Sequence, residues 1–127
     1  MKDYVVDTHA LIWYLADDKR LGAQAEAIFD DPDAHLILPA IVLAEIKYLA
    51  HKGRFPMSFD DVMRVVQTDS RCAIYPIDWT VVNQSPVGLD IHDGLIVGTA
   101  LAQTEKIDGV LTADQAIVAI GTVSTIW

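Results

Sequence analysis

The fold is decided by the stretch YVVDTHALIW, residues 4–13, where the spacing of apolar residues changes within a few positions. Residues 4–6 form a short continuous apolar run with two β-branched members, which is typical of a buried strand. Asp7 follows directly, and a helical pattern begins at residue 9. A strand that leads through one acid into a helix is the unit from which α/β proteins with parallel sheets are built.

The same alternation continues to the end of the chain. Because the predicted strands are short and apolar throughout, we expect a mostly parallel sheet that helices cover on both faces. The sequence therefore predicts an α/β three-layer sandwich with a central five-stranded sheet, formed by residues 1–127 as a single domain. The predicted strands are 4–6, 35–38, 72–77, 109–111 and 123–126, and the predicted helices are 9–16, 22–31, 40–52, 58–68, 79–84, 92–105 and 114–120.

Helix ends are marked in the sequence by capping residues. Ser58 with Asp61, and Thr112 with Gln115, have the spacing of a capping box. Gly53 and Gly121 follow predicted helices at the position where glycine is favoured.

Composition excludes several classes of protein. Of 127 residues, 52% are hydrophobic and 21% charged, which argues against intrinsic disorder. The single cysteine, Cys72, excludes a disulfide scaffold and a cysteine zinc site. Acids at positions 3 and 7 argue against a signal peptide, and no run approaches the roughly 18 apolar residues of a membrane span. We expect a cytoplasmic protein.

The net charge is −9, from 18 acidic and 9 basic residues. This balance disfavours tight non-specific binding to nucleic acid and favours divalent cations or a basic protein partner. An acidic protein can still act on nucleic acid when bound metal cancels the charge of its active site.

Two acids lie where predicted strands end. Asp7 follows the first strand, and Asp114 lies three residues after Leu111, in the first turn of the last helix. Ligands of parallel sheets bind at this edge. Helix capping, or attraction to the helix dipole, is the structural alternative for each acid.

Glu45 lies on the apolar side of the predicted helix 40–52. Ile41 precedes it by four residues and Leu49 follows by four, so Glu45 is predicted to face the sheet. A buried carboxylate has to be protonated, paired or bound to metal. The alternative is an acid at the edge of the stripe that reaches solvent.

Asp90 and Asp93 begin the most apolar helix of the chain. Asp90 is a candidate N-cap, which places Asp93 at the third helical position. Two carboxylates at one helix start call for a counter-charge, which a divalent cation provides. Carboxylates from four segments, without paired cysteine or histidine, fit Mg²⁺ or Mn²⁺, and such clusters are suited to phosphodiester hydrolysis.

Four segments of the chain resemble the motifs of PIN-domain nucleases, in particular the VapC-type toxins of toxin–antitoxin pairs. They are VDTHALIWYL (6–15), LAEI (43–46), DIHDGLIVGTAL (90–101) and LTAD (111–114). The resemblance implies the strand order 3-2-1-4-5 and an endoribonuclease that uses one or two Mg²⁺ or Mn²⁺ ions. It also implies a cognate antitoxin, a homodimer, and contact with DNA only through the antitoxin.

By this resemblance, an acidic quartet binds the metal and catalyses cleavage. Hydroxyl groups and a further acid support it. The quartet is Asp7, Glu45, Asp93 and Asp114, and the supporting residues are Thr8, Asp90 and Thr112. One position departs from the family pattern, because Gly94 stands where many relatives carry arginine after the third acid. The type of RNA remains open.

The only basic cluster, at residues 47–54, is a candidate RNA contact. It consists of Lys47, His51, Lys52 and Arg54. The alternative is an ordinary solvated helix face. His9 and His92 neighbour proposed ligands, either as structural histidines or as proton carriers.

Two other classes of function compete with the nuclease. A catalytically idle PIN-like domain is expected to lack one of the acids, and a phosphate-receiver domain is expected to carry lysine after a late strand. An aspartyl phosphatase normally has a second aspartate two residues after the first, where this chain has His9. The nuclease fits the residues best.

Overall fold

The structure is a computed structural model that describes residues 2–127. Its sheet has five strands, all paired in parallel in the order β3-β2-β1-β4-β5, which confirms the predicted topology. The strands are β1 (Lys2–Val6), β2 (Ala34–Pro39), β3 (Cys72–Tyr75), β4 (Gly109–Leu111) and β5 (Thr125–Ile126).

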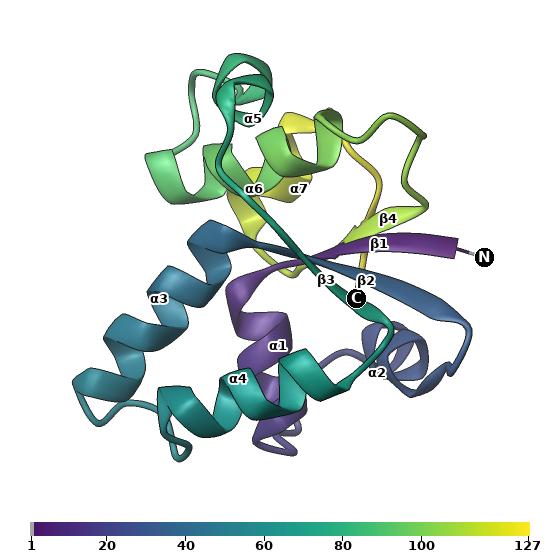
Figure 1. The fold of residues 1–127 in the computed structure, drawn as a ribbon. Helices are drawn as coiled ribbons and strands as arrows, with labels where there is room; N and C mark the ends of the chain where they lie inside the picture. The colour runs from purple at the N-terminus through teal and green to yellow at the C-terminus, as the bar shows by residue number, and fades with distance from the viewer. Residues whose placement is uncertain (1) are drawn as a thin grey trace.

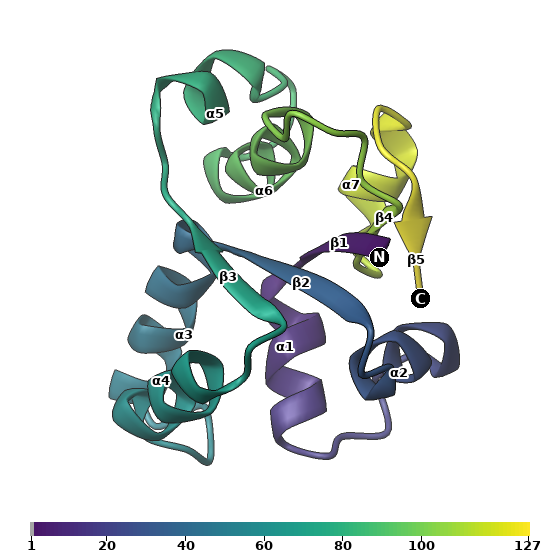
Figure 2. The same cartoon turned by 45° about the vertical axis from the view of Figure 1, so that its right-hand side comes forward.

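Helices cover both faces of this sheet, as the alternating pattern predicts. Figures 1 and 2 show α1 to α4 on one face and α5 to α7 on the other, so the fold is a three-layer sandwich. The helices are α1 (Thr8–Leu15), α2 (Ala23–Asp30), α3 (Ala40–His51), α4 (Phe59–Thr68), α5 (Trp79–Gln84), α6 (Ile91–Leu101) and α7 (Gln115–Ile120).

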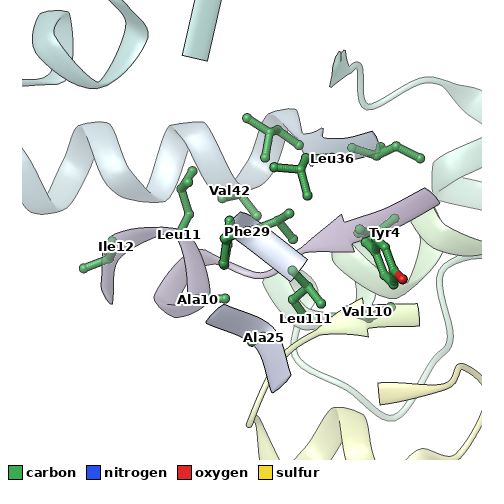
Figure 3. Packing of buried hydrophobic residues seen from close by; sticks show 14 of the residues in the cluster. Tyr4, Ala10, Leu11, Ile12, Ala25, Phe29, Leu36, Val42, Val110 and Leu111 are labelled. Atoms are coloured by element: carbon green, nitrogen blue, oxygen red, sulfur yellow. The ribbon is translucent and has the colours of Figure 1, made fainter. Parts of the chain in front are cut away.

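The core lies on both sides of the central strand β1. Val5 and Val6 alternate between the two faces and are both fully buried, so the strand has no solvated side. Figure 3 shows Leu11 of α1, Phe29 of α2 and Val42 of α3 among the buried residues packed with the strands. This packing fixes where each helix starts relative to the edge of the sheet.

Helix ends agree with the sequence signals in part. Ser58 caps α4 by accepting a hydrogen bond from the Asp61 amide, as predicted. The capping box expected at Thr112 is wrong, because Asp114 is the N-cap of α7 and Thr112 lies before the helix. Helix α6 ends at Leu101 and not, as predicted, at residue 105. Just beyond its end, the Gln103 side chain donates a hydrogen bond to the Thr99 carbonyl oxygen.

Helices α5 and α6 pack unusually closely. A Cβ atom on Gly98 would lie 2.5 Å from the Val81 carbonyl oxygen and 2.3 Å from the Ser85 Oγ. Only glycine permits this approach, so the contact sets how closely α5 packs on α6. Within residues 2–127, no helix is long and apolar enough to cross a membrane.

Candidate metal centre

Asp7 lies at the carboxyl end of β1 and caps α1. It is only 7% exposed, and both carboxylate oxygens accept hydrogen bonds. Oδ1 accepts from the Thr8 amide at 2.6 Å and Oδ2 from the Thr112 hydroxyl at 2.5 Å. Burial raises the pKa of Asp7 although both hydrogen bonds favour its charged form. The capping alternative is therefore correct for Asp7, but capping alone does not explain an acid with so little solvent.

Thr112 joins Asp7 to Asp114. The pairing of Val6 with Leu111 places the ends of β1 and β4 side by side, which brings the buried Thr112 against Asp7. The same Thr112 hydroxyl accepts a hydrogen bond from the Asp114 amide at 3.0 Å. Asp114 Oδ1 in turn accepts from the amides of Ala116 and Ile117. One threonine thus orients two of the predicted acids.

Asp93 lies at the start of α6, on the opposite side of the sheet from α1. Its amide donates to the Asp90 side chain at 3.0 Å, so Asp90 is the N-cap, as predicted. The pKa of Asp93 is raised to about 7, first by burial and then by the nearby charges of Asp114, Asp90 and Asp7. Asp7, Asp93 and Asp114, which come from three separate segments, therefore repel one another across a short distance.

Glu45 joins the group through Thr8. The Thr8 hydroxyl donates to Glu45 Oε1 at 3.0 Å, while its amide bonds to Asp7. Glu45 is only half-buried, with Val42 and Ile46 buried on one side and Ala44 exposed on the other. The prediction that Glu45 faces the sheet is wrong in this respect, because the buried face of α3 centres on Val42 and Ile46.

The donors at this edge are carboxylates and threonine hydroxyls, which fit a hard cation such as Mg²⁺ or Mn²⁺. Within residues 2–127, no three Asp, Glu, His or Cys side chains stand close enough together to form a ready-made metal cage. Three of the oxygens that a cation would use, both of Asp7 and Oδ1 of Asp114, are instead hydrogen-bonded to amides or to Thr112. The four ion pairs of the described chain all lie elsewhere, so no Lys or Arg neutralises these acids.

An aromatic wall that the sequence did not predict stands beside the acids. Trp13 and Trp127 line a cavity of about 150 Å³ together with Asp7 and Asp114. The Trp13 ring lies 5.6 Å from Trp127 and 5.4 Å from His9, measured between ring centroids. Trp127 lies outside every periodic stretch, so no sequence pattern places it near residue 7.

The predicted RNA-contacting residues lie apart from the acid cluster. They are exposed and occupy the last turn of α3 and the loop after it: Lys47, His51, Lys52 and Arg54. The glycine that departs from the family pattern, Gly94, is buried near α5, and a Cβ there would lie 3.5 Å from the Pro86 carbonyl oxygen.

The sheet is parallel, and acidic side chains lie at the carboxyl ends of its strands. These two features place the chain in the class of α/β proteins with a candidate metal centre at that edge. The family model described as the PIN domain matches residues 4–122, and the chain belongs to this family. A comparison with curated proteins gave no significant match.

Among solved structures, the chain is similar to one from the crystal structure of VapBC2 from Rickettsia felis bound to a DNA fragment from their promoter. The two chains share 15% sequence identity with a TM-score of 0.66, over 98% of this chain and 97% of the other. At this identity the match supports the fold.

Proposed function

We propose that this protein is a VapC-type toxin, a Mg²⁺- or Mn²⁺-dependent endoribonuclease that hydrolyses phosphodiester bonds of RNA. The observation that carries the proposal is that Asp7, Asp93 and Asp114, from three segments, lie near one another, and that no Lys or Arg of the described residues is paired with them. Burial, and then the nearby negative charges, raise the pKa of Asp93 to about 7. Carboxylates held in mutual repulsion cost stability unless a cation binds between them. Membership of the PIN family and the VapBC2-like fold support the same conclusion.

Each residue has a distinct part in this proposal. Asp7, Asp93, Asp114 and Glu45 would hold one or two ions. The Thr8 and Thr112 hydroxyls orient the carboxylates of Glu45 and Asp7, and Thr112 also accepts a hydrogen bond from the backbone amide of Asp114. Asp90 holds the start of α6 and thereby the backbone of Asp93. The chemistry that a bound divalent ion supplies is activation of water and stabilisation of charge on the phosphate oxygens.

Partners follow from the exposed apolar surface and the net charge. Trp79 is 75% exposed, Val87 97% and Ile91 72%, and all three belong to α5, α6 or the loop between them. Exposed large apolar residues that gather in one region mark protein-interaction surfaces. We propose that the chain forms a homodimer and binds a cognate antitoxin with a basic segment that faces the acids. Contact with DNA would come only through the antitoxin.

The test is cleavage by the purified protein of matched single-stranded RNA and DNA of the same sequence, with Mg²⁺, with Mn²⁺ and with EDTA. We expect metal-dependent fragments from the RNA alone, and none from RNA incubated with the Asp7→Asn variant. Cleavage that persists in EDTA, or that is unchanged in Asp7→Asn, would contradict the proposal. An inert wild-type protein that still binds RNA would favour a catalytically idle PIN domain.

A further inference from the structure

A second pocket opens beside the acids, on the side away from Trp127. Its volume is about 470 Å³, and residues of α1, α3 and α6 line it. Ile41, Ala44, Tyr48 and Leu49 of α3 form an apolar wall, and the imidazoles of His9 and His92 stand on the other helices. Apolar walls with a few polar groups, at this volume, are typical of sites for small organic groups.

The pocket is continuous with the candidate metal centre because Glu45 belongs to both. Glu45 lines the pocket and also accepts the hydrogen bond from Thr8 that ties it to Asp7. His9 is shared in the same way, since it lines this pocket and the cavity between Asp7 and Asp114. A phosphodiester held at the acids would therefore carry its adjoining nucleoside to the mouth of the pocket.

Tyr48 forms the exposed part of the apolar wall. Its side chain is 58% exposed although it is aromatic and adjoins an apolar pocket. Three neighbouring residues on one side of α3 are Glu45, Tyr48 and Leu49, and Lys52 follows as the C-cap of the helix. An acid, an aromatic ring and a cation therefore follow one another along α3 and its end. The Lys52 ammonium lies 5.6 Å from the centre of the Tyr48 ring.

The described part of this acidic protein carries basic side chains without an acidic partner along the second half of α3 and just after it, beside Tyr48. Three of the arginines, Arg20, Arg64 and Arg71, are paired with neighbouring aspartates. In residues 2–127, Lys47, Lys52 and Arg54 form no such pair. The end of α3 beyond the pocket can therefore receive phosphate groups, which gives it charge complementarity to a nucleic-acid strand.

We propose that this pocket receives the nucleobase next to the scissile phosphodiester, with Tyr48 as its stacking platform and Lys52 beside the following phosphate. The inference rests on the proposed nuclease function and adds to it a base-binding subsite. Stacking on one aromatic ring tolerates any base, because every base has a π-face. Tyr48 is then a substrate-binding residue and takes no part in the hydrolysis.

The test measures binding of a short fluorescein-labelled single-stranded RNA to the Asp93→Asn protein by fluorescence anisotropy. In this background, Tyr48→Ala should weaken binding on the order of tenfold, whereas Tyr48→Phe should not. Ala44→Leu fills the pocket without removing a polar group and should also weaken binding. Val65→Ala removes an exposed apolar side chain of α4 that does not line the pocket and is the matched control.

Abasic substitutions locate the base. When the ribose at the pocket position carries no base, the Tyr48→Ala protein and its parent should bind the RNA with equal affinity. The reason is that both changes, the loss of the base and the loss of the ring, remove the same contact. If Tyr48→Ala and Ala44→Leu both bind RNA like the parent, or if Val65→Ala weakens binding equally, the subsite is wrong.

A cleavage assay with proteins that retain Asp93 separates this inference from the proposed function. Metal-dependent RNA cleavage with the same KM in Tyr48→Ala and wild type would leave the nuclease intact and overturn the subsite. Tyr48-dependent RNA binding without any cleavage would retain the subsite and overturn the nuclease. If Tyr48→Ala impairs capture of a co-expressed protein partner but not of RNA, the pocket binds protein and the inference fails.

Discussion

Acidic residues have different surroundings at the two ends of the sheet. At the amino end, Asp3 pairs with His35 at 2.8 Å, Asp108 accepts a hydrogen bond from the Asp3 amide, and Asp69 pairs with Arg71. At the carboxyl end, Asp7, Asp93 and Asp114 lie near one another, and none of them is paired with a Lys or Arg among residues 2–127.

The pKa values of Asp69 and Asp93, one from each end, move in opposite directions. The hydrogen bonds from Arg71 lower the pKa of Asp69, whereas burial and like charges raise that of Asp93 to about 7. The charge of Asp69 therefore stabilises the fold, and the charge of Asp93 is retained at a cost in stability. An arrangement that the fold alone would disfavour points to a role in binding.

The largest expected effect separates the two ends by activity. Asp93→Asn should lower metal-dependent RNA cleavage at least about 100-fold, because loss of a ligand should exceed the loss caused by an outer-shell partner. The matched change Asp3→Asn at the amino end should leave the rate unchanged. Initial rates at saturating Mg²⁺ or Mn²⁺ provide the measurement, and equal losses in both variants would erase the distinction between the ends.

A smaller effect is expected at Thr112, which touches the acids without being one of them. Thr112→Val removes the hydroxyl that bonds to Asp7 and Asp114 and should weaken Mg²⁺ or Mn²⁺ binding by about 10- to 100-fold. Thr99→Val is the control, because Thr99 is equally buried but its hydroxyl bonds only to the Leu95 carbonyl. Calorimetric titration with metal should show no change for Thr99→Val, and an unchanged affinity in Thr112→Val would contradict the bridging role.

The smallest expected effect is on thermal stability without metal. Asp93 has a pKa of about 7 when folded and an ordinary value of 3.8, so the folded state holds the extra proton between these pH values. Its contribution to stability is present at low pH and is lost as the pH rises towards and through 7. In EDTA, the unfolding midpoint should fall by a few degrees from pH 5 to pH 8, and Asp93→Asn should flatten this slope.

The amino end supplies the opposite sign for the same experiment. The lowered pKa of Asp69 stabilises the fold above its ordinary pKa of 3.8, and this contribution is lost as the pH falls through the folded value. Asp69→Asn should therefore lower the unfolding midpoint by the same amount at pH 5 and at pH 8. The slope of the midpoint against pH should stay as in the wild type. A slope that Asp69→Asn removes and Asp93→Asn preserves would reverse the assignment.

Most of the fold could be predicted from local pattern. Short apolar runs predicted the five strands, and Ser58 and Asp90 were predicted as helix caps, whereas capping by Asp7 was only the alternative to its role as a ligand. The error at Thr112 has a clear cause. Thr112 and Asp114 both suit a capping position, and only the partner across the sheet, Asp7, decides which one is free to cap α7.

The site was less predictable than the fold. Periodicity placed Glu45 on the apolar stripe of α3, but the buried face of the packed helix centres on Val42 and Ile46 and leaves Glu45 half-buried at its edge. The pocket at Tyr48 depends on how α1, α3 and α6 meet, and Trp127 reaches Asp7 through the pairing of β5 with β4. Contacts between distant segments carry no local signal in a single sequence.

The glycine contact between α5 and α6 bears on how this protein tolerates inherited variation. Gly98 touches none of the acids, yet any side chain there would collide with Val81 and Ser85 and force α5 and α6 apart. Asp93 lies on the same helix, five positions earlier, so the packing of the helix that carries this acid would be disturbed. Gly98 has no reactive side chain, yet substitutions at this position should be tolerated as poorly as substitutions of a metal ligand. Among randomly mutated genes chosen for loss of function, lesions at codon 98 should therefore appear beside lesions at codon 93.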